Sequence, residues 1–162
     1  MISPPRSDPR PHQQIACSER PFSIQSLTSS RLRKHADYQR AYADSRKRQS
    51  ASMSWFLAAQ TPAFAGAALP AGPRVGLTAG KVLGKAHERN RIKRRMREVL
   101  RRHVDLLPAG CDLILHPRRQ VLSIEFAKLE AEVVRILQQA RAEAARAVRA
   151  EAKATPAPTQ VL

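Results

Sequence analysis

Acidic residues, aromatic residues and long apolar runs are all scarce in this sequence. Asp and Glu number 13 against 29 Lys and Arg, which gives the 162-residue chain a formal net charge of +16. A chain this basic repels itself unless a polyanion neutralises it, so the composition favours a nucleic-acid partner. Because no apolar run approaches the roughly 20 residues that span a bilayer, we expect no transmembrane helix and no membrane partner.

Cysteine is also scarce, and its placement excludes several kinds of site. Cys17 and Cys111 lie in unrelated contexts, and neither belongs to a CxxC pair or to a Cys/His cluster with ligand spacing. We therefore expect no disulfide, no structural zinc and no metal or cofactor bound by the protein itself. The N-terminal residues contain no apolar stretch like that of a secretory signal, so we predict a cytoplasmic protein.

Composition divides the chain into three parts. Residues 1–30 are rich in Pro, Ser, Arg and Gln, which predicts a disordered basic extension. Residues 31–138 carry the apolar periodicity of a folded domain, interrupted at residues 61–73 by three prolines and two glycines. That stretch is typical of a flexible hairpin connection whose ends lie close together. Residues 139–162, mostly Ala, Arg and Glu, predict a solvated helical extension and then a disordered tail from Thr155.

Apolar spacing within the domain predicts a mixture of helices and strands. We expect helices at residues 36–43, 86–103 and 124–138, and strands at residues 53–58, 74–79 and 112–115. The first two strands are expected to pair, and Pro117 is expected to stop the third. Ser123 is the expected N-cap of the last helix. Tyr38 and Tyr42 lie one turn apart, so they share one face of the first helix.

The most basic stretch is residues 81–102, which hold ten Lys and Arg against two Glu. On a helix its polar residues fall on three stripes: Arg89, Lys93 and Arg97; Asn90, Arg94 and Arg101; and Arg91, Arg95 and Arg102. Like charges one turn apart destabilise a free helix, which disfavours a merely solubilising charge run. The planar fork of Arg donates two parallel hydrogen bonds to a phosphate, so the preference for Arg favours specific contacts with nucleic acid.

Charge alone leaves several kinds of nucleic-acid-binding protein open. A general RNA-binding or ribosomal-type protein would carry such a stretch, and so would a DNA-binding basic helix. The sequence offers neither a dimerisation heptad nor a second helix of a helix-turn-helix, which disfavours DNA binding. Gly84–Glu98 (GKAHERNRIKRRMRE) decides between these readings, because it closely resembles the RNR motif of the bacterial ribonuclease P protein family.

The resemblance extends over residues 31–138, about two thirds of the chain. It includes the segments at residues 31–42, 74–78 and 112–118. Three positions depart from the family pattern. Val82 stands where a basic residue is usual, Leu100 where an aromatic is common, and Pro117 where a small residue is usual.

The resemblance implies both a fold and a role. The fold would be α+β, a two-layer α/β sandwich in which helices pack on a four-stranded sheet, with a left-handed βαβ crossover. The role would be that of a protein subunit of ribonuclease P, the endonuclease that removes the 5′ leader of precursor tRNA. Its partners would be the catalytic RNA and precursor tRNA, with no obligate protein partner. The RNA subunit would bind the Mg²⁺ ions and perform the hydrolysis.

Two groups of site residues follow from the resemblance and from chemistry. The expected contacts with the catalytic RNA are Lys85, Arg89, Asn90, Arg91 and Arg95. The expected contacts with the single-stranded leader are Tyr38, Tyr42, Phe56, Lys81, Lys93, Arg94 and Arg97, because aromatic platforms in a basic groove suit single strands. We expect no catalytic residue in the protein, since neither His87 nor His103 has a partner that completes a catalytic set.

Overall fold

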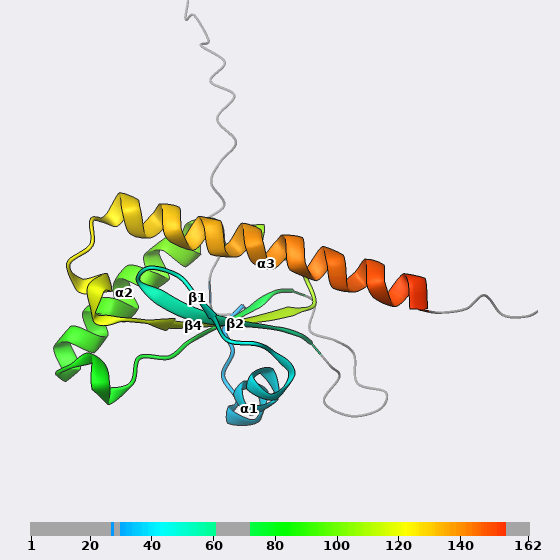
Figure 1. Cartoon of the computed structure of the whole chain (residues 1–162). Helices are drawn as coiled ribbons and strands as arrows, with labels where there is room; N and C mark the ends of the chain where they lie inside the picture. The colour runs from blue at the N-terminus through cyan, green and yellow to red at the C-terminus, as the bar shows by residue number, and fades with distance from the viewer. Residues whose placement is uncertain (1–26, 28–29, 61–71, 155–162) are drawn as a thin grey trace, which may run out of the picture.

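A computed structural model of the chain describes Leu27, residues 30–60 and residues 72–154. Its helices and strands are α1 (His35–Asp44), β1 (Arg48–Gln49), β2 (Met53–Ala59), β3 (Arg74–Leu77), α2 (Ala86–His103), β4 (Cys111–Pro117) and α3 (Phe126–Ala154) (Figure 1). Three short 3-10 helices separate some of them, namely η1 (Lys81–Leu83), η2 (Val104–Leu106) and η3 (Arg119–Leu122). The α+β class is confirmed, and so is the four-stranded sheet that the resemblance implied.

The sheet has the strand order β1-β2-β4-β3, in which β4 is antiparallel to β2 and parallel to β3. The expected pairing of residues 53–58 with residues 74–79 is therefore wrong. The strand β4 lies between them because residues 111–115 are all buried, as a central strand covered on both faces requires. The helix α2 joins the parallel neighbours β3 and β4, so a βαβ unit is present, and its left hand stays a prediction.

Some expectations concern residues outside the described part of the chain. These are the disorder of residues 1–30 apart from Leu27 and Ser30, the flexible connection at residues 61–71, and the tail from Thr155. The two ends of the connection are described. Gln60 Nε2 donates a hydrogen bond to the Gly72 carbonyl at 3.0 Å, so the ends lie close together as expected.

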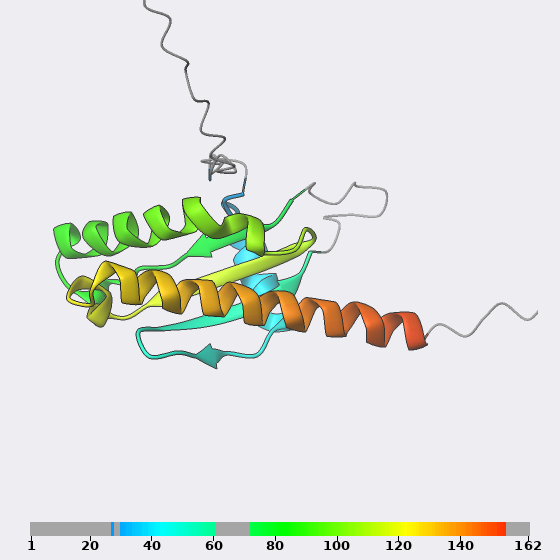
Figure 2. The same ribbon diagram turned by 90° about the horizontal axis from the view of Figure 1, so that it is seen from above.

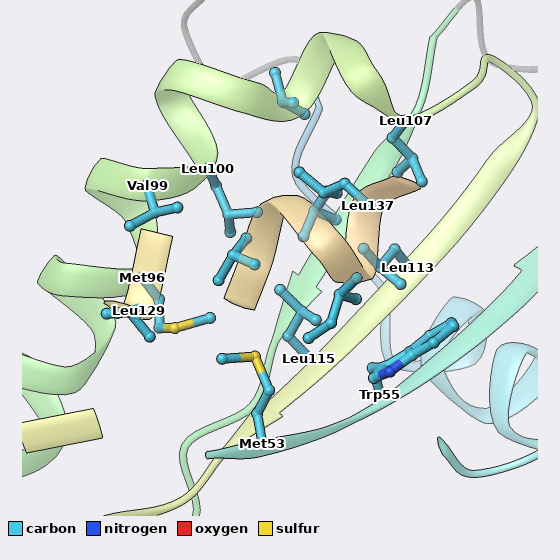
Figure 3. Close-up of a cluster of buried hydrophobic side chains, with 14 of the residues drawn as sticks. Met53, Trp55, Met96, Val99, Leu100, Leu107, Leu113, Leu115, Leu129 and Leu137 are labelled. Atoms are coloured by element: carbon cyan, nitrogen blue, oxygen red, sulfur yellow. The ribbon is translucent and has the colours of Figure 1, made fainter. Parts of the chain in front are cut away.

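The main core lies between the sheet and the helices α2 and α3, which pack side by side on one face (Figures 1 and 2). Met53, Trp55, Leu113 and Leu115 project toward these helices from β2 and β4 (Figure 3). They meet fully buried side chains of both helices, among them Ile92, Met96, Val99, Leu129, Val133 and Leu137. The apolar stripe of α3 ends at Ala140, and the helix continues to Ala154.

The start of α3 differs from the sequence expectation. The helix begins at Phe126, and the Ser123 hydroxyl donates a hydrogen bond back to the Gln120 carbonyl instead of capping α3. Ser123 thus closes the 3-10 turn η3, which the apolar spacing did not indicate, and its prediction as an N-cap is wrong. Within the described ranges, no helix combines the length and apolar character needed to cross a membrane.

The helix α1 packs alone on the opposite face of the sheet (Figure 1). Its Ala41 is buried with Ala58 of β2 and Ile114 of β4. A partly buried charge cluster fixes its position, because Arg74 binds Asp112 through two hydrogen bonds, of 2.8 and 2.6 Å, and reaches Asp37 of α1 at 3.1 Å. These hydrogen bonds, together with the nearby carboxylates, raise the pKa of Arg74 although its burial opposes the shift.

Candidate nucleic-acid interface

The two flanks of α2 have different partners. On the flank that faces η3 and α3, cations contact acidic groups and backbone carbonyls. Arg102, for example, pairs with Glu98 at 3.1 Å and with Glu130 at 3.5 Å. On the other flank and the outer surface, Lys93, Arg94 and Arg97 form no ion pair within the described part of the chain. The free positive charge of α2 is therefore concentrated toward β3 and toward solvent.

Arg95 has a different environment from the one expected of an RNA contact. Its guanidinium donates to the backbone carbonyls of Val121, Leu122 and Ile124, with the Leu122 contact at 2.9 Å. These carbonyls belong to η3 and to the turn that leads into α3. Because the fork of Arg95 is used in this way, the side chain fastens α2 to the start of α3 and has little capacity left for phosphate.

A cationic cleft lies at the β3 edge of the sheet. The N-terminal segment pairs with this edge, since Leu32 N–H donates to the Val75 carbonyl at 3.0 Å and Val75 N–H donates to the Ser30 carbonyl. The cleft has a volume of about 240 Å³. Its lining includes Arg31 and Arg33 from that segment, Lys93 and Arg97 from α2, and the apolar side chains of Leu27, Val75, Leu77 and Leu100.

An aromatic cluster lies between α1 and the sheet, and we call Tyr38, Tyr42, Phe56 and His116 the aromatic patch. Tyr42 contacts all three of the others, with ring centroids 6.4 Å from Tyr38, 5.0 Å from Phe56 and 5.7 Å from His116. Its hydroxyl forms a 2.9 Å hydrogen bond with His116 Nε2. All four side chains are half-buried, so they pack near the buried cluster of Ala41, Ala58 and Ile114 and still present part of their surface to solvent.

The aromatic patch and the cationic cleft meet around the β3 edge. Tyr38 lies against Gly76 of β3, and its hydroxyl donates to the Leu32 carbonyl at 3.4 Å. Burial raises the pKa of Tyr38, and the positive charge of Arg31 is close enough to oppose that shift. Since Arg31 also lines the cleft, one surface runs from the aromatic rings to Lys93 and Arg97.

Four members of this surface were not among the residues expected from the sequence. Arg31 and Arg33 lie in the segment before α1. They line the cleft because this segment pairs with the β3 edge of the sheet. His116 lies two residues after Ile114 on β4, so both side chains are on the face that α1 covers, and the period-two pattern of the strand contains this signal. Lys47 stands one residue before β1, and its charge, after burial, helps to lower the pKa of His116.

The remaining predicted residues occupy the exposed surface at and beyond the start of α2. Exposed side chains among them are Lys81, Lys85, Asn90, Arg91 and Arg94. Arg89 is half-buried, and its Nε has no hydrogen-bond partner among the described residues. Lys81 and Arg94 lie outside the lining of the cleft, so the structure does not bring them together with the aromatic patch.

The two histidines of α2 have different environments. His103 Nε2 lies 2.8 Å from Glu130 of α3, and this contact links the two helices. His87 is exposed in the first turn of α2. In the described ranges, no three His, Cys, Asp or Glu side chains come together as a group that would hold a metal ion.

The fold and the continuous aromatic and cationic surface define a basic α+β nucleic-acid-binding protein. A family model described as Ribonuclease P matches residues 28–141. The chain belongs to the ribonuclease P protein family. It is a protein subunit of the ribonuclease P holoenzyme and acts in maturation of tRNA 5′ ends. This membership decides against the general RNA-binding or ribosomal-type alternative.

Individual relatives agree with this membership. The ribonuclease P protein component of Thermobifida fusca (strain YX) is 33% identical over 134 residues, which cover 80% of this chain and 90% of the relative. The solved RNase P protein of Staphylococcus aureus matches with a TM-score of 0.56 at 24% identity and covers 69% of this chain and 95% of its own. That of Thermotoga maritima matches with a TM-score of 0.55 at 22% identity, over 67% and 96%. The two structural matches support the fold.

Proposed function

We propose that the two faces of this subunit bind different RNAs. The 5′ leader of precursor tRNA lies along the aromatic patch and the cationic cleft, and the catalytic RNA binds the exposed residues near the start of α2. The observation that carries the proposal is the continuity of half-buried rings with four cations around the β3 edge. Single-stranded nucleic acid is gripped by this combination, at roughly 1–3 kcal/mol for each stacked base.

The contacts with the leader divide by chemistry. The exposed parts of Tyr42, Phe56 and His116 offer surfaces for bases, and Lys47 adds a positive charge beside them. Lys93 and Arg97 face the cleft without acidic partners among the described residues, so they remain available to phosphates. A strand that passes from the rings to the cleft would meet stacking first and charge second.

The contacts with the catalytic RNA are Lys85, Arg89, Asn90 and Arg91. Lys85, Asn90 and Arg91 are exposed and lie in the first two turns of α2 or just before them. We assign Arg95 a positioning role, because its three carbonyl contacts hold η3 and the start of α3 against this helix. The folded domain that presents these residues is the proposed unit 31–138, flanked by the two extensions.

The chemical step is proposed to belong to the RNA. Hydrolysis of a phosphodiester needs a positioned water and stabilisation of the leaving oxygen, which Mg²⁺ ions bound by the RNA subunit would supply. The protein contributes substrate affinity and reduces repulsion between the two RNAs through its net charge of +16. We place the protein in the cytoplasm, where its proposed substrate would be processed.

The test compares the holoenzyme's binding of precursor tRNA carrying a leader of several nucleotides with its binding of mature tRNA. Lys93→Gln with Arg97→Gln should weaken binding of the precursor and leave mature tRNA unaffected, because only the precursor has a strand to fill the cleft. Tyr42→Leu should have the same selective effect. Arg141→Gln, an exposed change on α3, is the control for loss of one charge and is compared with Arg97→Gln alone.

The second half of the test measures assembly with the RNA subunit. Arg91→Gln should weaken assembly for every substrate and reduce the salt dependence, since each lost phosphate contact releases roughly one counterion fewer. Excess protein should then restore activity. If the cleft variant weakens precursor and mature tRNA equally, the leader does not lie in this cleft.

A further inference from the structure

A second cleft lies at the opposite edge of the sheet, between β1 and the C-terminal half of α3. Its volume is about 610 Å³, and its lining comprises Arg48, Gln49, Trp55, Gln139, Ala142, Glu143 and Arg146. The family match ends at residue 141, so part of this wall lies beyond the shared domain. The cleft is on the same face of the sheet as α2 and on the face opposite the aromatic patch.

Side-chain contacts hold the floor of this cleft together. Arg48 lies over the Trp55 ring, 5.0 Å from its centroid, and also pairs with Glu143. That ion pair fastens α3 to β1 beyond Ala140, where the buried apolar stripe of the helix has ended. At the β1 side, Gln49 accepts a hydrogen bond from Arg118 at 2.9 Å, which ties β1 to the residue that follows β4. The position of α3 over this edge is therefore fixed by polar contacts.

The outer wall of the cleft carries positive charge that pairs with no acidic group among the described residues. Gln139, Ala142, Arg146 and Arg149 follow one another at steps of three and four residues, which places them on one stripe of α3. Arg146 and Arg149 are exposed, and neither forms an ion pair within the described ranges. Figure 1 shows this part of the helix projecting past the sheet, where few residues are buried.

We propose that this cleft and the adjoining stripe of α3 form a second binding surface for the phosphate backbone of the catalytic RNA. The proposal rests on the proposed function. Two guanidiniums that pair with no acidic group among the described residues lie one helical turn apart beside the cleft, where they complement successive phosphates, and Gln139 adds a hydrogen-bond donor. The partner is the RNA subunit because the leader is assigned to the other face and the other edge of the sheet. Two separated contacts would fix the subunit's orientation on one large RNA.

The experiment measures assembly of full-length protein with the RNA subunit over a series of salt concentrations. Arg146→Gln with Arg149→Gln should weaken assembly on the order of tenfold at low salt and reduce the slope of log affinity against log salt by about two. The control is Arg141→Gln, compared with Arg146→Gln alone so that each variant loses one charge, because Arg141 is exposed on the same helix roughly 120° away from the stripe. It should change affinity less than twofold. Gln keeps helix propensity, and circular dichroism checks that α3 is intact.

The outcomes separate this inference from the proposed function. Failure of the wild-type protein to bind the RNA subunit would contradict the proposed function. If the wild type binds normally and the stripe variant affects assembly no more than the control does, the second surface is overturned and the proposed function is not. A variant that assembles normally but loses affinity for precursor tRNA would show that the stripe binds phosphates of precursor tRNA and not those of the RNA subunit. Unchanged binding of both RNAs by the stripe variant would also overturn the proposal, and it would point to an acidic protein as the partner of the stripe.

Discussion

At the residue scale, Gly76 has a specific reason to lack a side chain. A Cβ at this position would lie 2.7 Å from Tyr38 Cε1 and 2.9 Å from both Cζ and the hydroxyl oxygen. Gly76→Ala should therefore cost roughly 1–3 kcal/mol of unfolding free energy, as overpacking usually does. Urea unfolding measures the cost. In a Tyr38→Ala background the same change should cost much less, and an equal cost in both backgrounds would show that the ring yields freely.

His116 gives the stability of the protein a defined pH dependence. Burial, and then the charge of Lys47, lower the pKa of this imidazole below its ordinary value of 6.5 in the folded state. The unfolded chain therefore binds the proton more readily, so stability is complete above about pH 6.5 and decreases as the pH falls toward the folded pKa. The urea midpoint should drop less between pH 7.5 and pH 5.5 in His116→Gln than in the wild type. Identical drops would contradict the assignment.

At the scale of elements, Arg95 and Arg94 provide a contrast between neighbouring residues of one helix. Arg95→Gln should lower the unfolding free energy by roughly 1–3 kcal/mol, because several carbonyls of η3 lose their donors. Arg94→Gln should change stability by less than about 0.5 kcal/mol, since that side chain is exposed. Thermal unfolding compares the two variants directly. Equal destabilisation would mean that the carbonyl contacts contribute nothing beyond charge.

The elements also differ in how much of them the sequence determines locally. The helix at residues 86–103 was predicted with the bounds that α2 has, because the apolar residues from Ile92 to Leu100 repeat at helical spacing. The order of the strands was not predictable in the same way. Whether β2 pairs with β3 or with β4 depends on contacts across long stretches of chain, and local alternation does not encode them. The prediction of Ser123 as the N-cap of α3 was wrong for a similar reason, since Ser123 suits a 3-10 turn as well as a helix start.

The candidate site shows the same division. Charge and spacing indicate which residues of α2 are cationic, but they do not indicate which flank meets the carbonyls of η3 and Ile124, so the carbonyl contacts of Arg95 could not be predicted. The two arginines before α1 gain their place only through pairing of that segment with Val75. The aromatic patch was predicted in part, because Tyr38 and Tyr42 share a helix face, and His116 joins them from a strand.

At the scale of the whole molecule, the distribution of charge separates the proposed binding surfaces. One cleft lies at the β3 edge and the other at the β1 edge, and exposed cations of α2 lie on the face between them. The protein would then act by holding two polyanions together, which matters most when few other cations screen their repulsion. The central claim is that the protein supplies binding and screening while the RNA supplies the chemistry.

The most direct measurement of this claim is precursor tRNA cleavage by a bacterial ribonuclease P RNA at several Mg²⁺ concentrations, with and without the purified protein. The protein alone should cleave nothing. With the RNA present, the protein should accelerate cleavage most at the lowest Mg²⁺ concentration and progressively less as Mg²⁺ takes over the screening. Equal rates with and without protein at low Mg²⁺, or cleavage by nuclease-free protein without the RNA, would contradict the account.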